Sequence, residues 1–283
     1  MTVVNRVKVM SRLDIAQKGL PQDGRSMVII AGKKIDIRVS TAPTVHGEKI
    51  VMRLLYQDEK LMRLRQLGLA KYILTPYENM VHSSGGIILV TGPTGSGKTT
   101  TLYASLAEID NEAHNVITIE DPVEYKLAGY SQIEIKPKLG LNFANALRSV
   151  LRQDPDVIMV GEMRDAETAK IAIQSALTGH LVFSTVHTNS APATITRLID
   201  MGIEPFLVSS TIIGVLAQRL VRRICPECKI SFEPHPEQLR QLGIKTQAFH
   251  KMGKKFYRGE GCDKCRNTGY RAVSYTHLRA HET

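Results

Sequence analysis

The chain has 283 residues, of which 43% are hydrophobic and 23% charged, a composition typical of a globular protein with two or three domains. No apolar run approaches the roughly 18 residues of a membrane-spanning helix, so we expect no such helix. The charged N-terminal stretch MTVVNRVKVMSRLD lacks the apolar core of a signal peptide, and we therefore expect a cytoplasmic protein.

The net charge of +10 is spread unevenly along the chain. Basic residues outnumber acidic ones by 14 to 6 in residues 1–75 and by 13 to 5 in 219–271, whereas acidic residues lead by 15 to 9 in 76–218. A solvated surface explains such a pattern without any partner. Alternatively, the basic flanks face nucleic acid, anionic lipid or phosphates held by a neighbouring subunit, and charge alone does not separate these alternatives.

Residues 1–57 are expected to form a small N-terminal α/β domain that is truncated at its start. Two alternating runs, IDIRV at 35–39 and KIVMRL at 49–54, predict strands of an antiparallel sheet. Residues 58–75 open with the charged and helically patterned stretch DEKLMRLRQLGLAK, which predicts a linker helix.

Residues 76–218 have the hydrophobic pattern of an α/β core. Strongly apolar runs alternate with helical segments, which predicts a parallel sheet covered on both faces; the runs are GGIILV (85–90), NVITI (115–119), DVIMV (156–160) and HLVFSTV (180–186). Residues 219–272 are basic and contain every cysteine of the chain, so we expect a separate, truncated subdomain there. The last stretch, VSYTHLRAHET at 273–283, reads like translated adapter sequence and is predicted to lie outside the native fold.

A phosphate-binding loop follows the first core strand. The pattern G-x-x-x-x-G-K-[ST] is present between a predicted strand and a predicted helix, and its residues are Gly92, Pro93, Thr94, Gly95, Ser96, Gly97, Lys98 and Thr99, with Thr100 next. The glycines let backbone N–H groups surround phosphates at a helix N-terminus. Lys98 would supply charge to the β- and γ-phosphates and Thr99 a hydroxyl to Mg²⁺. This pattern predicts binding of ATP and Mg²⁺.

Glu162 ends the strand at 156–160 where a P-loop ATPase needs a carboxylate for Mg²⁺ or for a metal-bound water. The alternative is that Glu162 caps the next helix, although Asp165 already stands as a predicted N-cap. With the P-loop upstream, we favour the metal role.

The octapeptide TIEDPVEY places three carboxylates, Glu120, Asp121 and Glu124, directly after the strand at 115–119. Crowded carboxylates raise one another's pKa unless a cation or donors intervene, and the carboxyl edge of a parallel sheet is where ligands bind. One of them is expected to orient the attacking water as a general base. The alternative is a solvated acidic turn.

His187 follows the strand at 180–186 and is a candidate sensor of the γ-phosphate, although a histidine at a strand end is more often structural.

The four cysteines form two C-x-x-C pairs with 33 residues between them; they are Cys225, Cys228, Cys262 and Cys265. Two such pairs predict a closed Cys₄ site for structural Zn²⁺. The alternative, a redox pair, does not suit a reducing cytoplasm.

In this order the motifs resemble the type II secretion and type IV pilus assembly ATPases, over almost the whole chain from RVKVMSRLDIAQKGLPQDGR (6–25) to GCDKCRNTGYR (261–271). The resemblance implies a RecA-like P-loop core between a small α/β domain and a zinc-binding subdomain. It also implies that Glu124 is the base, Glu162 the ligand of the Mg²⁺-bound water, and His187 a residue near the γ-phosphate. Arg38 and Arg53 resemble arginines that reach the nucleotide from the small domain, although ordinary strand-face arginines are the simpler interpretation.

Members of this family form hexameric rings on the cytoplasmic face of the inner membrane, where they work with platform and recruitment proteins. By resemblance we expect a homo-hexamer, peripheral to that membrane, that hydrolyses ATP to power protein secretion, with acidic phospholipid as a further partner. The four cysteines favour secretion or pilus extension over retraction. Type IV pilus assembly is the first alternative function. A nucleic-acid motor is a more distant one, and we expect no nucleic acid because aromatics make up only 5% of the chain.

Overall fold

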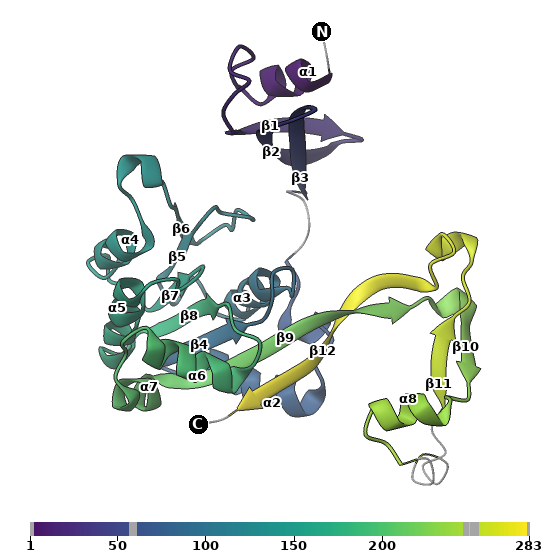
Figure 1. The fold of residues 1–283 in the computed structure, drawn as a ribbon. Coiled ribbons are helices and arrows are strands. Elements are labelled where there is room, and N and C mark those ends of the chain that lie inside the picture. Colours follow the sequence, from purple (N-terminus) through teal and green to yellow (C-terminus); the bar gives the residue numbers. More distant parts are fainter. Residues whose placement is uncertain (1–2, 57–60, 246–248, 250–254, 282–283) are drawn as a thin grey trace. The chain divides into compact units, whose positions relative to one another are not determined.

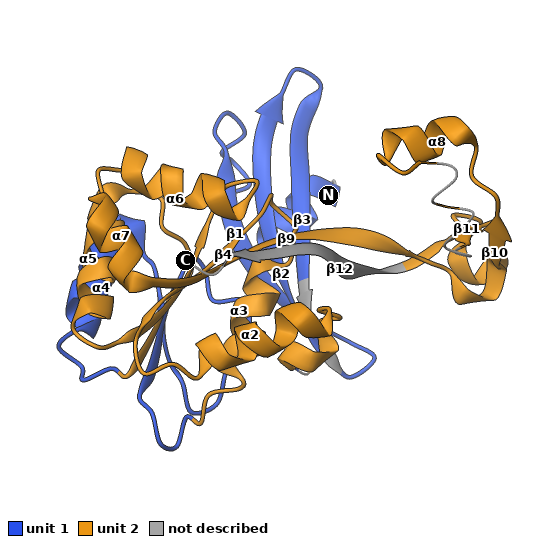
Figure 2. Cartoon of the chain, turned by 90° about the horizontal axis from the view of Figure 1, so that it is seen from below, with its two compact units in different colours: residues 1–61, 111–155 blue, residues 62–110, 156–283 orange. Residues whose placement is uncertain are grey.

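In a computed structural model, residues 3–56, 61–245, 249 and 255–281 are described. The chain divides into two compact units, the first formed by residues 1–61 and 111–155 and the second by 62–110 and 156–283 (Figure 2). The predicted core, 76–218, is therefore shared between the units. Among the described helices, none combines the length and the hydropathy that a transmembrane span requires.

The first unit begins with helix α1 (Val3–Met10) and an antiparallel sheet ordered β1 (Gln22–Ile30), β2 (Lys33–Thr44) and β3 (Gly47–Tyr56) (Figure 1). The two predicted strands lie within β2 and β3. Ala31 and Gly32 join β1 to β2 with φ of +51° and +78°, as a two-residue hairpin turn with positive φ at both positions requires. This turn sets the register of the sheet and so decides which side chains become neighbours.

The rest of the first unit is a parallel pair of strands, β5 (Val116–Glu120) and β6 (Ser131–Glu134), followed by a 3₁₀ turn (Pro137–Leu139) and helix α4 (Phe143–Val150). All residues of β5 are buried, as the apolar run predicts. Asn142 caps α4 by accepting a hydrogen bond from Asn145 N at 2.8 Å.

The second unit contains a parallel sheet in the order β9 (Ile212–Ile224), β4 (Gly86–Thr91), β8 (Leu181–Val186) and β7 (Val157–Val160). One helix precedes β4 in the chain and the others lie between the strands; they are α2 (Lys71–Val81), α3 (Lys98–Leu106), α5 (Ala166–Leu177), α6 (Ala191–Asp200) and α7 (Pro205–Thr211). Every residue of β4, β7 and β8 is buried, as expected for a parallel sheet covered on both faces. The predicted α/β class with a parallel sheet is confirmed.

Beyond β9 the second unit continues into the cysteine-bearing region. Its elements are a 3₁₀ turn (Pro226–Cys228), β10 (Lys229–Phe232), α8 (Pro236–Gln241), β11 (Phe256–Gly259), a second 3₁₀ turn (Asp263–Cys265) and β12 (Tyr270–His281). Strands β10 and β11 pair antiparallel, and β12 pairs antiparallel with β9 (Figure 1).

Two segments differ from expectation. Instead of a continuous linker helix over 58–75, residues 61–70 contain only a 3₁₀ turn (Leu64–Gln66), and α2 begins at Lys71; residues 57–60 lie outside the described part. Gly68 has φ of +81°, which a right-handed helix does not accommodate, and Leu64 is fully buried in the second unit.

The second difference is at the C-terminal end. Residues 273–281, predicted to lie outside the fold, form most of β12. Strand β9 has β4 on one side and β12 on the other. Without β12, strand β9 would be an edge strand. Main-chain hydrogen bonds to an edge strand depend little on the side chains of the strand that pairs with it, so many sequences would pair there. The origin of residues 273–283 stays a prediction.

Candidate nucleotide site and cysteine cluster

The P-loop lies between the end of β4 at Thr91 and the start of α3 at Lys98, as predicted. Gly92, Gly95 and Gly97 have φ of +146°, +75° and +85°, conformations that other residues rarely adopt. Gly97 is the N-cap of α3, so the loop leads directly into the N-terminus of that helix. Helix N-termini of this kind bind anions through backbone N–H groups and the helix dipole.

Lys98 is folded back onto the loop. Its Nζ donates to the carbonyl oxygens of Gly92 at 2.9 Å and Pro93 at 3.2 Å. Burial lowers the pKa of Lys98, while the negative charge of Glu162 opposes that shift. A nearby anion such as a phosphate would favour the charged form of this side chain.

Glu162 and His187 are brought together by the neighbouring strands β7 and β8. His187 Nε2 lies 3.3 Å from Glu162 Oε2, and Arg164 donates to the other carboxylate oxygen at 2.6 Å. The capping alternative for Glu162 is wrong, because Asp165 caps α5 by accepting from Thr168 N at 2.8 Å. Arg164 was not singled out from the sequence; its position two residues after Glu162 is the only signal that points to it.

A chain of hydroxyls connects the P-loop strand to the segment after His187. Thr91 Oγ1 donates to Val186 O at 2.8 Å and accepts from Thr188 N at 3.0 Å. The hydroxyl of Thr188 in turn lies 2.6 Å from that of Thr194 in α6. These contacts hold the ends of β4 and β8 together, and the sequence does not predict them because single threonines carry no motif.

In the first unit, three arginines form a row across the antiparallel sheet. Arg25 is paired with Arg38, and Arg38 with Arg53, in the strand register. Together with Asp121 and other residues they line a hollow of about 480 Å³. Like charges directly opposite one another destabilise a sheet, so such a row favours an anion, and Arg25 already pairs with the carboxylate of Glu134 at 2.9 Å. Arg38 and Arg53 were predicted from the sequence, whereas Arg25 was not, because its place beside Arg38 follows only from the strand register.

Arg38 has the most unusual environment of the three. Its Nη2 donates to Val123 O at 3.1 Å, whereas its buried Nε has no hydrogen-bond partner within the described residues. Burial lowers the pKa of Arg38, and the charge of Arg25 lowers it further. A buried guanidinium nitrogen without an acceptor is costly, and an anionic ligand would satisfy it.

The three crowded carboxylates have different environments. Glu120 is buried, and its Oε1 accepts from Thr118 Oγ1 at 2.6 Å and from Gln132 Nε2 at 3.1 Å, which gives it a structural role. Asp121 is exposed and Glu124 half-buried. Burial raises the pKa of Glu124, although the charges of Arg38 and Arg53 act in the opposite direction. A carboxylate with a raised pKa suits a general base, so Glu124 differs from a residue in a solvated turn.

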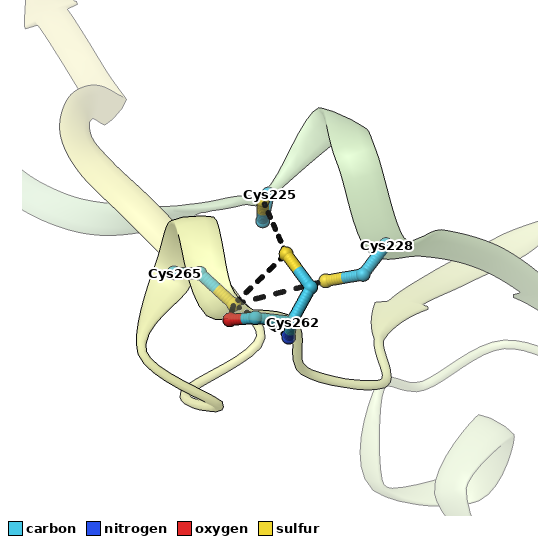
Figure 3. Close-up of side chains that lie close together, drawn as sticks. All are labelled: Cys225, Cys228, Cys262 and Cys265. Carbon is cyan, nitrogen blue, oxygen red and sulfur yellow. Dashed lines mark hydrogen bonds between the residues drawn. The ribbon is translucent and has the colours of Figure 1, made fainter.

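The four cysteines converge from two segments of the second unit, and their sulfurs point toward one another (Figure 3). All four are free thiols. The Sγ atoms of Cys225 and Cys262 are 3.9 Å apart, those of Cys228 and Cys265 also 3.9 Å, and all four lie within 4.8 Å of one another. Sulfur donors in this arrangement fit a tetrahedral Zn²⁺ site.

The thiols also differ in acidity. Burial disfavours ionisation of Cys265, but N–H donors of Cys262 and Gly269 outweigh it and lower the pKa to about 6. Burial raises the pKa of Cys228 to about 11. Close sulfurs cannot all ionise without a cation among them, and a bound metal ion supplies that cation.

Comparison with known proteins finds relatives among bacterial secretion and pilus assembly proteins. The sequence matches the family described as "Type II/IV secretion system protein" over residues 1–277. It is 51% identical to the type II secretion system ATPase E of Vibrio cholerae over 275 residues, which cover 97% of this chain and 54% of that protein. It is 50% identical to the type IV pilus assembly ATPase PilB of Thermus thermophilus over 269 residues, which cover 95% of this chain and 30% of that protein.

Among solved structures, the pilus retraction motor PilT with bound ADP is similar, with a TM-score of 0.58 and 31% identity. The similarity covers 89% of this chain and 73% of that one. The chain spans about half the length of the type II secretion relatives it matches.

Proposed function

The chain belongs to the type II/IV secretion system protein family, as its motifs predict, and on that basis we propose that it is the motor part of an ATPase. The proposed reaction is Mg²⁺-dependent ATP hydrolysis by a hexamer that powers type II secretion across the bacterial envelope. The observation that carries the proposal is the P-loop, in which the buried Lys98 lies at the N-terminus of α3 and donates to the carbonyl oxygens of Gly92 and Pro93. Such a lysine is suited to triphosphate binding.

Each predicted residue of the second unit receives a role in this proposal. The loop from Gly92 to Thr100 binds the phosphates, with Lys98 as their cation and Thr99 as a ligand of Mg²⁺. Glu162 would hold a Mg²⁺-bound water, and its contacts with Arg164 and His187 orient both of its carboxylate oxygens. Thr99 and Glu162 would hold Mg²⁺ in this site, where the ion would supply positive charge to the phosphates.

We assign the general base to Glu124 and nucleotide contact to Arg38 and Arg53. The raised pKa of Glu124 supports its assignment, because a base is most effective when its pKa lies nearer the working pH. The arginine row supports the second assignment, since Arg38 Nε is buried without an acceptor among the described residues. We add Arg25 to this pair because the register places it beside Arg38.

The cysteine cluster is assigned to structural Zn²⁺. A closed site with four thiolates leaves no position for a substrate, so the metal would stabilise the fold of its subdomain and take no part in the reaction. Platform and recruitment proteins at the inner membrane are the proposed partners, and acidic phospholipid is a further one for the basic flanks. The proposed location is the cytoplasmic face of that membrane.

ATP hydrolysis by a ring-forming protein that contains this segment tests the proposal. Glu124→Gln keeps the shape of the side chain but cannot take a proton, so single-turnover hydrolysis should fall about 10²–10⁴-fold with nearly unchanged ATP affinity. Lys98→Ala should lose ATP binding itself, because its charge faces the phosphates in the ground state. Glu204→Gln, an exposed carboxylate at the start of α7 without a capping bond, is the matched control. Hydrolysis at the normal rate in Glu124→Gln would refute the assignment of the base.

Type IV pilus assembly is the second candidate function, because identity to PilB of Thermus thermophilus is 50%, against 51% for the ATPase E of Vibrio cholerae. Both functions share the ATPase reaction and differ in the membrane partner. Co-purification of the full-length protein with its platform protein would separate them.

A further inference from the structure

One buried amide, that of Gln218, connects strand β9 to the P-loop. Strand β9 runs beside β4, and Ala217 pairs with Thr91, the last residue before the loop. Gln218 is therefore the next residue along β9, and only 1% of its surface is exposed. Beyond it the strand becomes largely exposed and leads to Cys225. Gln218 is thus the last buried residue of β9 before the cysteine-bearing region.

Both ends of the Gln218 amide are used. Its Nε2 donates to the carbonyl oxygen of Ser96 at 2.7 Å, and its Oε1 accepts from Thr101 Oγ1 at 2.9 Å. A carbonyl oxygen only accepts, so the contact with Ser96 settles which end of the amide is the nitrogen. One side chain thus holds the P-loop and the first turn of α3 at the same time.

The backbone of Gln218 also packs closely against the loop. A Cβ atom at Gly92 would lie 2.3 Å from the Gln218 carbonyl oxygen, so only glycine fits there. The main chain of Gln218 therefore lies against Gly92, the first residue of the P-loop, while its side chain holds Ser96, four residues further on.

The hydrogen bond to Ser96 has a consequence for the next peptide group. In a planar trans peptide the C=O of one residue and the N–H of the next point in opposite directions. An amide that holds the Ser96 carbonyl on the side of β9 therefore turns the N–H of Gly97 away from β9. Gly97 is the N-cap of α3, at the helix end where anions bind.

We propose that Gln218 is a positioning residue of the nucleotide site, which holds the Ser96–Gly97 peptide so that the Gly97 N–H is directed at the phosphates. This inference rests on the proposed function, because it requires that the P-loop binds a nucleotide. Gln218 acts through the loop and does not itself touch the ligand. Gln218 lies on strand β9, which continues to the cysteine cluster, and this residue is not part of the P-loop motif.

Equilibrium binding of MgATP to Gln218→Met is the first test. Methionine has a similar volume but no donor, so we expect affinity to fall about tenfold, the size of effect that follows from one buried hydrogen bond. Gln174→Met, at an exposed position of α5, is the matched control and should bind normally. Unchanged affinity in Gln218→Met would overturn the inference. No binding by the unsubstituted protein would instead overturn the proposed function, and this inference with it.

Gln218→Glu separates positioning from packing. The new carboxyl group, when protonated, donates an O–H to Ser96, whereas the carboxylate cannot, and burial raises its pKa toward neutrality. The ratio of its MgATP dissociation constant to that of the unsubstituted protein should therefore be high at about pH 8.5 and fall toward one at about pH 6. A purely structural role gives a ratio that does not change with pH, and that result would overturn the proposal. If Gln218→Met does not fold, this pH series decides alone.

Discussion

The cysteine cluster should contain about one Zn²⁺ per chain, because its four sulfur atoms lie within 4.8 Å of one another, close enough to share one metal ion. Four thiolates at Zn–S distances of about 2.3 Å have sulfurs about 3.8 Å apart. The distances between Cys225 and Cys262, Cys228 and Cys265, and Cys262 and Cys265 are 3.9, 3.9 and 3.7 Å. These three distances agree with the expected edge to within about 0.2 Å.

The contribution of one cysteine to zinc affinity can be measured by removing that cysteine. Structural Zn²⁺ sites of this type bind with about 10–16 kcal/mol, so the loss of one thiolate of four in Cys228→Ser should cost on the order of 3 kcal/mol. That is roughly a hundredfold in metal affinity. Ser231→Ala, an exposed change in the neighbouring strand β10, should leave the affinity unchanged.

The assay is metal analysis of protein purified under reducing conditions, with a thiol titration on the same sample. Competition with a chelator of known zinc affinity then gives the difference between Cys228→Ser and the unsubstituted protein. Four freely titrating thiols and no bound zinc would refute the reasoning. Equal zinc affinity in Cys228→Ser would show that Cys228 is not a ligand.

Further predictions concern the nucleotide site and the charged surface. Burial raises the pKa of Glu124, so as the pH is lowered the hydrolysis rate should begin to fall at a higher pH than with a glutamate of ordinary pKa. Arg38 lowers this pKa, so in Arg38→Leu the rate should begin to fall at a still higher pH. A pH profile of single-turnover rates that is the same in both proteins would contradict this. Gly92→Ala should abolish MgATP binding, because the new Cβ atom would lie 2.3 Å from the Gln218 carbonyl oxygen, and an equilibrium binding assay measures this. Gly95→Ala, whose Cβ atom would meet no protein atom within 4 Å, should lower folding stability only through backbone strain of about 1 kcal/mol, which chemical denaturation measures. Vesicles of acidic phospholipid should stimulate steady-state hydrolysis, and single-stranded DNA or RNA should not; strong stimulation by nucleic acid at physiological salt would instead favour the nucleic-acid motor.

The sequence by itself determined the features that depend on local spacing. The P-loop could be recognised because its glycines are needed for backbone angles within one short loop, between a strand and a helix that local pattern also predicts. The two C-x-x-C pairs specify a metal site for a similar reason, since each pair is a short turn. The apolar runs at 85–90 and 156–160 predicted buried strands because a parallel strand is covered on both faces. The helix predicted for 58–75 was wrong where Gly68 and buried leucines interrupt it.

Only the tertiary structure decided which distant residues meet. Arg25 joins Arg38 through strand register, and a register is set by the hairpin turn and by the packing of the whole sheet. The contact between Glu162 and His187 depends on the order of the parallel strands, which the chain sequence does not state. Gln218 carries no motif, and it reaches Ser96 because β9 lies beside the P-loop strand. Local patterns specify backbone conformation over a few residues, whereas these contacts result from long-range packing, in which many segments must agree on one arrangement.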